Sequence, residues 1–196
     1  MSKALNLIII IIITVVIVSS FLKYEQFSNE VSYVRSTIDN KSYLVRNMPD
    51  KIDAANLLAT IKTKLSRLVN YISNKYPNDT AVERLVSKYN SDNISETGKN
   101  SKYTSYSVNK GEKIVFCIRS RDGKEELVEA NTLMFVALHE IAHVMTKSIG
   151  HTDEFWNNFR FLLKEAIKIN VYKRQDFRRH PVKYCGTEIT DTPLND

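Results

Sequence analysis

An uncharged apolar run near the start of the chain, LNLIIIIIITVVIVSSFL at residues 5–22, constrains the fold most strongly. As a helix rising about 1.5 Å per residue it would extend roughly 27 Å, close to the ~30 Å hydrocarbon thickness of a bilayer. The run exceeds the usual apolar core of a secretory signal, and no clear A-x-A-like cleavage site follows it. We therefore predict a retained single-pass transmembrane anchor over residues 1–23, with a cleaved signal peptide as the alternative.

The charges that flank this run bear on its orientation. Lys3 precedes the run alone, whereas Lys23, Arg35 and Lys41 follow it. Because Lys and Arg tend to stay on the cytoplasmic side, the pattern favours a cytosolic domain, although long domains often cross membranes regardless of this rule. The prediction is a membrane protein with its folded domain on the cytosolic side.

The rest of the chain is long enough for one hydrophobic core and leaves no length for a second full domain. Residues 24–52 have mixed polarity without sustained periodicity and are predicted to form a stalk or an irregular segment. Residues 53–196 are predicted to form the folded domain. The polar run at residues 91–102, SDNISETGKNSK, is expected to be a surface loop of that domain.

Two kinds of periodicity follow one another inside this domain. From Asp53 to the residue before Pro77, apolar residues recur at helical spacing, at Leu58, Ile61, Leu65, Leu68, Ile72 and Tyr76. Residues 103–108 then alternate, 109–111 suit a turn, and KIVFCIR at 113–119 is typical of a buried strand. We predict an α+β fold with a small antiparallel sheet packed on helices. An exposed edge of strand 113–119 could take an extended substrate as an additional strand.

The sequence HEIAH at residues 139–143 carries the clearest chemical signal. In a helix beginning near Asn131, the expected N-cap, His139 and His143 are four residues apart and project from the same side. Glu140 lies about 100° around the helix from His139, close enough to act on a metal-bound water. Buried among apolar neighbours, two histidines and a glutamate without partners would be costly, which favours a metal site over ordinary helix positions.

A third ligand is expected just beyond this helix. Gly150 is able to reverse the chain, and Thr152 is expected to cap the following helix, which would bring His151 back toward the first two histidines. Three imidazoles leave one coordination position open for water, as catalytic zinc sites require. Glu165 is the alternative third ligand, as in zinc peptidases that use a downstream glutamate.

HEIAH followed by GHTDEFW at residues 150–156 resembles the WLM and SprT-like zinc metallopeptidases. The resemblance, which covers mainly residues 131–163, implies one Zn²⁺ held by His139, His143 and His151, with Glu140 as the general base. It also implies that Phe155 and Trp156 lock the second helix onto the core behind the site.

Residues 180–186, HPVKYCG, are a second segment that is able to return to the site. Tyr184 there is a candidate donor to the oxyanion of a tetrahedral intermediate, although packing is the favoured role for it and for Cys185. Cys117 and Cys185 form no C-x-x-C pair, so they predict neither a cysteine zinc site nor a disulfide framework. A single bridge between them is left open.

Together these features predict a membrane-anchored zinc-dependent metallopeptidase, which hydrolyses a protein or peptide substrate with a zinc-bound water activated by Glu140. One alternative is a catalytically inactive, zinc-stabilised, membrane-tethered binding protein. Another is a DNA-associated SprT-like protease. The net charge of +6 permits nucleic-acid binding, but KRQDFRR at residues 173–179 is the one local basic cluster and an anchor hinders access to DNA, so this partner is not favoured.

Overall fold

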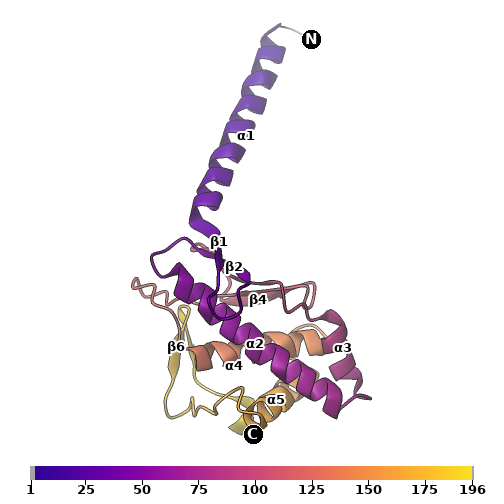
Figure 1. Ribbon diagram of the computed structural model, residues 1–196. Helices are drawn as coiled ribbons and strands as arrows, with labels where there is room; N and C mark the ends of the chain where they lie inside the picture. Colours follow the sequence, from indigo (N-terminus) through magenta and orange to yellow (C-terminus); the bar gives the residue numbers. More distant parts are fainter. Residues whose placement is uncertain (1–2, 196) are drawn as a thin grey trace.

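The computed structural model describes residues 3–195, apart from the side chains of residues 3–4 and 23–29 (Figure 1). The helices are α1 (Lys3–Glu30), α2 (Lys51–Lys75), α3 (Thr80–Lys88), α4 (Ala130–Met145) and α5 (Asp153–Lys168), with a short 3-10 turn at Pro193–Asn195. The strands are β1 (Val31–Arg35), β2 (Ser42–Arg46), β3 (Ile94–Glu96), β4 (Ser105–Val108), β5 (Lys113–Phe116), β6 (Val182–Tyr184) and β7 (Thr187–Ile189). The side chains of Lys3 and Lys23, used in the orientation argument, lie outside the described residues.

Helix α1 projects away from the rest of the protein (Figure 1). Its segment Leu5–Leu22 has a mean hydropathy of 2.9, and none of this segment is buried against the domain. By length and composition α1 is therefore able to cross a membrane. A signal helix near an N-terminus would share both features.

The predicted α+β class is confirmed, but the sheet is mixed rather than wholly antiparallel. Its strand order is β1-β2-β3-β5-β4. The outer pairs β1/β2 and β4/β5 are antiparallel, whereas β3 is parallel to both of its neighbours, β2 and β5. Strands β6 and β7 form a separate two-stranded hairpin. Hairpins are local in sequence, so the antiparallel β4/β5 pair could be predicted, whereas the parallel pairs join distant segments.

The expectation that residues 24–52 are a stalk or irregular is wrong. The end of α1 and both strands of the β1/β2 hairpin lie in this segment, and the hairpin belongs to the main sheet. Tyr43 and Val45 of β2 are buried. Polar and apolar residues do not alternate strictly in either strand, VSYVR or SYLVR, so periodicity did not mark them. Their register is set by pairing with each other and, for β2, with β3.

The surface loop expected at residues 91–102 is also wrong in part, because the run contains the central strand β3. All three residues of this strand are buried. Its Glu96 carboxylate accepts hydrogen bonds from the Arg46 backbone N–H and from Nε of Arg119, at 2.7 and 2.8 Å. A buried polar residue is tolerated when it is paired, and the partners come from remote strands, which explains why polarity alone suggested a loop.

Helix α2 shows the predicted apolar stripe. Leu58, Ile61, Leu65, Leu68 and Ile72 are fully buried, and Tyr76 just after the helix is partly buried against the core. Helix α2 packs against β2 and α4, and α4 in turn packs against β4 and α5. The helix with the histidines thus lies between the edge of the sheet and α5, a position that both supports it and leaves one side accessible.

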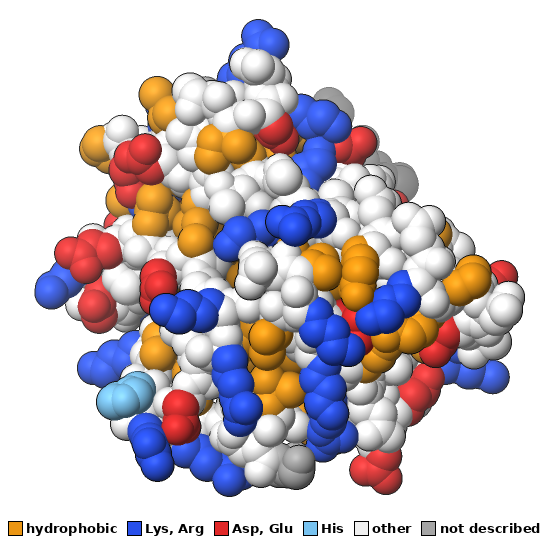
Figure 2. All heavy atoms as spheres, turned by 60° about the horizontal axis from the view of Figure 1, so that its bottom comes forward, with side chains coloured by type: hydrophobic (Ala, Val, Ile, Leu, Met, Phe, Trp, Pro, Cys, Tyr) orange, Lys and Arg blue, Asp and Glu red, His pale blue; other side chains and the backbone are white. Residues whose placement is uncertain are grey.

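Positive charge is spread over the surface rather than confined to one groove. On the face turned away from α1, Lys and Arg side chains are numerous and are interspersed with acidic and apolar ones (Figure 2). Several basic side chains carry acidic partners, as in the pair Arg178–Asp191 at 2.8 Å. Such a mixture of charges is typical of a solvated surface.

Candidate metal centre

Helix α4 presents His139, Glu140 and His143 from an otherwise apolar segment. Most of its residues are buried, so packing rather than capping holds it in place. The predicted N-cap, Asn131, is wrong: the helix begins at Ala130, and the side chain of Asn131 instead exchanges two hydrogen bonds with the backbone of Lys173. Asn131 therefore joins the start of α4 to the segment that follows α5.

The bend between α4 and α5 is held by several side chains. Gly150 adopts φ +83°, the left-handed conformation expected for a chain reversal. The Lys110 ammonium donates to the carbonyls of residues 146, 147 and 148, at 2.9, 2.8 and 3.1 Å. The Glu154 carboxylate accepts from the backbone N–H groups of Lys147 and Ser148. Thr152 is the N-cap of α5, as predicted.

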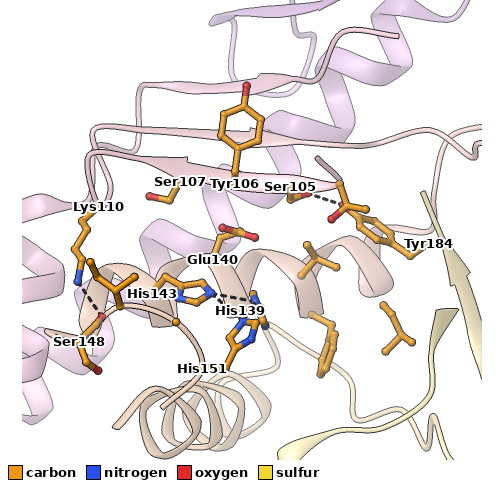
Figure 3. Close-up of a pocket in the computed structure, with 16 residues that line it drawn as sticks. Ser105, Tyr106, Ser107, Lys110, His139, Glu140, His143, Ser148, His151 and Tyr184 are labelled. Carbon is orange, nitrogen blue, oxygen red and sulfur yellow. Dashed lines mark hydrogen bonds between the residues drawn. The ribbon is translucent and has the colours of Figure 1, made fainter. Parts of the chain in front are cut away.

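This bend brings the three histidines together (Figure 3). The Nε2 atoms of His139 and His143 are 3.2 Å apart, those of His143 and His151 3.2 Å, and those of His151 and His139 3.1 Å. Ligands of a tetrahedral zinc site, each about 2.0–2.1 Å from the ion, lie roughly 3.3 Å from one another. The three nitrogens therefore form a triangle of the size that one metal ion requires, and together they could hold such an ion.

Aromatic rings fix the orientation of these imidazoles. Phe155 is fully buried, and its ring stacks on His143 with centroids 4.3 Å apart. Phe159 meets the ring of His139 edge to face at 5.3 Å. The expectation that Trp156 locks α5 onto the core is wrong, because Trp156 is 39% exposed and lies beside His151 at 5.5 Å. Phe155 and Phe159 fill that role instead.

Burial sets the protonation states at this site. It lowers the pKa of His139 to about 3 and that of His143 to about 4, with further lowering by the neighbouring histidines. Both imidazoles are thus neutral at physiological pH, the form that ligates metals. Burial also raises the pKa of Glu140 to about 7, within the range suited to a general base.

A cavity of about 580 Å³ opens over the histidines and Glu140. The Glu140 carboxylate lies between the histidine cluster and β4, whose Ser105 and Ser107 also line the cavity (Figure 3). The sequence left open whether strand 113–119 has an exposed edge; β5 pairs with β3 and β4 and is therefore interior. Among the described strands, β4 is the edge beside the site.

Tyr184 reaches the same cavity from the β6/β7 hairpin. It is 3% exposed, and its hydroxyl donates to the Cys117 carbonyl at 2.7 Å and lies 2.8 Å from Ser105 Oγ. The neighbouring Cys185 forms a disulfide with Cys117, the bridge that the sequence left open. The disulfide and the hydroxyl thus attach the same hairpin to the end of β5.

Glu165, the alternative ligand, points elsewhere. Its buried carboxylate pairs with Lys75 at 2.9 Å and with Lys168, and it accepts a hydrogen bond from the Tyr76 hydroxyl at 3.0 Å. These partners satisfy the carboxylate. Glu165 is accordingly absent from the group of described residues whose donor atoms converge.

Sequence reasoning missed Lys110, Glu154 and Ser105, which shape the site without being ligands. No local pattern marks Lys110 or Ser105, because both contact segments that are remote in sequence. The one available signal was their place on the predicted hairpin that precedes the helix with HEIAH.

An α+β fold in which an HExxH helix and a following histidine converge on one point defines the class of metallopeptidase-type proteins. The family model described as WLM domain matches residues 40–194. The chain belongs to the WLM family.

Related sequences occur in large DNA viruses. The uncharacterized protein R325 of Acanthamoeba polyphaga mimivirus is 36% identical over 198 residues, covering 99% of this chain and 100% of the relative. The uncharacterized protein 042R of Invertebrate iridescent virus 3 is 46% identical over 84 residues, 42% of this chain and 49% of the relative. Among solved structures, Wss1 from Saccharomyces cerevisiae is similar with a TM-score of 0.49 and 23% identity, covering 64% of this chain and 87% of Wss1.

Proposed function

We propose that this chain is a membrane-anchored zinc metallopeptidase. The observation that carries the proposal is the convergence of His139, His143 and His151 on one point, with the Glu140 carboxylate beside it in an open cavity. Membership of the WLM family supports the same reaction class. A site that served stability alone would have no use for a buried glutamate next to the ligands.

The three imidazoles would hold one Zn²⁺, which when bound supplies a Lewis acid for peptide hydrolysis. Glu140 accepts a proton from the attacking water and returns it to the nitrogen of the leaving amine. The pKa of about 7 that burial gives Glu140 suits a group that first accepts this proton and then donates it. Phe155 and Phe159 hold two of the rings in place during this cycle.

The substrate is proposed to be an extended polypeptide aligned along β4. This strand has backbone groups on the side that β5 does not occupy, and it runs across α4 over Glu140 (Figure 3). Backbone pairing binds a chain in a sequence-tolerant way, with side-chain pockets adding preference. A second cavity of about 630 Å³, which shares His139 and Phe135 with the first, offers such a pocket.

The anchor is proposed to be α1. Its exposed apolar surface over residues 5–22 has no other described element to cover it, and leaving it in water would be unfavourable. We propose single-pass insertion. The flanking charges favour the cytosolic side for the domain, whereas the Cys117–Cys185 disulfide is typical of an oxidising compartment.

The metal dependence provides the first test. The full chain purified in detergent is expected to contain one zinc per chain by elemental analysis and to cleave an unfolded protein such as reduced casein. Removal of the metal with 1,10-phenanthroline should abolish cleavage, and added Zn²⁺ should restore it. Cleavage that persists in metal-free protein would contradict the proposal, and so would a zinc-loaded chain without turnover on any unfolded substrate.

Tyr184 provides a separate test of the oxyanion assignment. Because its hydroxyl hydrogen already goes to the Cys117 carbonyl, we expect Tyr184→Phe to lower kcat/KM by less than about tenfold and stability by about 1 kcal/mol. A direct oxyanion donor would instead be worth about 10²–10³ in kcat. Thermal unfolding and zinc content, measured on the same sample, show whether any loss of activity comes from unfolding or loss of metal. A loss of about 10²–10³ in kcat at unchanged Tm would instead identify the hydroxyl as a donor to the oxyanion.

A further inference from the structure

A cavity of about 350 Å³, separate from the metal centre, has four cations among the eleven residues that line it. Its basic residues are Arg46, Lys99, Arg119 and Arg121, and Glu125 is the one carboxylate in its lining. Glu125 is shared between Arg46 at 2.8 Å and Lys99 at 3.6 Å. Glu96 and Asp50, just outside the lining, also bind Arg119, so the cationic donors left for an anion are Nη2 of Arg119 and the guanidinium of Arg121.

Two of these cations, Arg119 and Arg121, have hydrogen-bond donors that no carboxylate among the described residues occupies. Arg119 is 2% exposed and uses Nε and Nη1 on Glu96 and Asp50, but its Nη2 is buried without a hydrogen-bond partner. Arg121 donates to the Tyr103 carbonyl, and no carboxylate pairs with it among the described residues. A buried donor without a partner is costly and commonly marks the place of a water or an ion.

Two residues of the cavity lining, Arg46 and Lys99, lie next to the end of α1. Arg46 pairs in the β1/β2 hairpin with Val31, the residue directly after α1. On the rim, the Lys99 N–H donates to the carboxylate of Glu30, the last residue of α1. Glu30 lies eight helical steps beyond Leu22, the end of the apolar run, which is about 12 Å at 1.5 Å per residue, whereas the headgroup layer adds roughly 5–8 Å to the hydrocarbon core. The cavity rim therefore lies about 4–7 Å beyond the headgroups, a gap that the long side chains of Lys99 and Arg121 are able to span.

We propose that this cavity binds the phosphate group of an anionic phospholipid and so docks the domain against the membrane that α1 crosses. Guanidinium groups suit phosphate because their donors match pairs of its oxygens, and the cavity has three of them. Lys99 and Arg121 are both exposed and flexible enough to reach outward to a headgroup. The proposal rests on the membrane anchoring proposed above, but not on the peptidase activity.

The test uses the full chain in detergent micelles at about 0.15 M salt, where long-range charge effects are screened beyond roughly 8 Å. Phosphatidylserine, phosphatidylcholine or inorganic phosphate is added, and bound lipid is titrated by native mass spectrometry alongside Tm. The double variant Lys99→Gln/Arg121→Gln removes two cavity cations. Its matched control, Lys102→Gln/Lys124→Gln, removes two exposed lysines from nearby loops that do not line the cavity.

Wild-type protein should bind phosphatidylserine in preference to phosphatidylcholine, and the cavity variant should lose about tenfold or more of that affinity while the control keeps it. Equal loss in both variants would overturn the proposal in favour of diffuse surface charge. Stabilisation by inorganic phosphate as large as that by phosphatidylserine would refute the lipid as the source. The cavity variant should match wild type in intact mass, in liposome flotation and in casein cleavage. Loss of flotation would show that the anchoring proposal fails, and absence of cleavage would show that the peptidase proposal fails, independently of lipid binding.

Discussion

Glu140→Gln is expected to retain one zinc per chain and to lower kcat/KM for peptide hydrolysis by about 10²–10⁴-fold, the usual contribution of a general base. Glutamine has nearly the same shape as glutamate, so the cavity and the histidine triangle should remain. The amide cannot accept the proton from water, which removes the step assigned to Glu140. Elemental analysis and initial rates on a fluorogenic peptide measure the two quantities.

The interpretation of this variant depends on Tm. Glu140 is 6% exposed, and burying its charge is unfavourable, so the neutral amide should leave stability unchanged or slightly higher. If Tm fell strongly, the loss of activity would be explained by misfolding of the variant rather than by the missing proton acceptor. Undiminished hydrolysis would exclude Glu140 from the mechanism, and a wild-type chain equally inactive would favour the zinc-stabilised binding protein.

His151→Ala should lose zinc, whereas Glu165→Gln should keep it. The imidazole of His151 completes a triangle with sides of 3.1–3.2 Å, and an ion held by His139 and His143 alone would lack its third protein ligand. Loss of a residue that merely orients a ligand costs about 10–100-fold in metal affinity, so loss of a ligand should cost more than about 100-fold. Competition with a chromophoric chelator measures that affinity.

Glu165→Gln serves as the contrasting variant because its effect should fall on stability alone. Lys75, Lys168 and Tyr76 all contact the buried Glu165 carboxylate, so its neutralisation should destabilise the fold by about 1–3 kcal/mol. Zinc content at a temperature where the variant is folded should match wild type. Loss of zinc on changing Glu165 but not His151 would reverse the ligand assignment.

Local sequence patterns were sufficient to predict which residues come together where their approach depends only on helical spacing or on a single turn. His139, Glu140 and His143 follow from a four-residue repeat within a single helix. The approach of His151 follows from Gly150 and Thr152, which act within a few residues of it. Each of these inferences uses the geometry of one short segment, which the residues themselves determine.

The features that could not be predicted from the sequence depend on contacts between segments that are far apart in the chain. Strand β3 carries polar residues, and its Glu96 is paired in the sheet with Arg119, which lies just beyond β5. The edge position of β4 depends on the order of all five strands, which no single segment specifies. Lys110 likewise supports the bend before His151 from a hairpin more than thirty residues upstream. Such contacts are visible only once the chain is folded.

The disulfide between Cys117 and Cys185 encloses α4, α5 and every residue assigned to metal binding or proton transfer in one covalent ring. With a separation of 68 residues, closure of such a ring restricts the unfolded chain by about 4 kcal/mol on a chain-entropy model. The proposed activity on unfolded chains would also expose the protein to attack by its own copies. A single cut inside the ring leaves both pieces joined, so a nicked molecule would keep its histidines together and separate into fragments only after reduction.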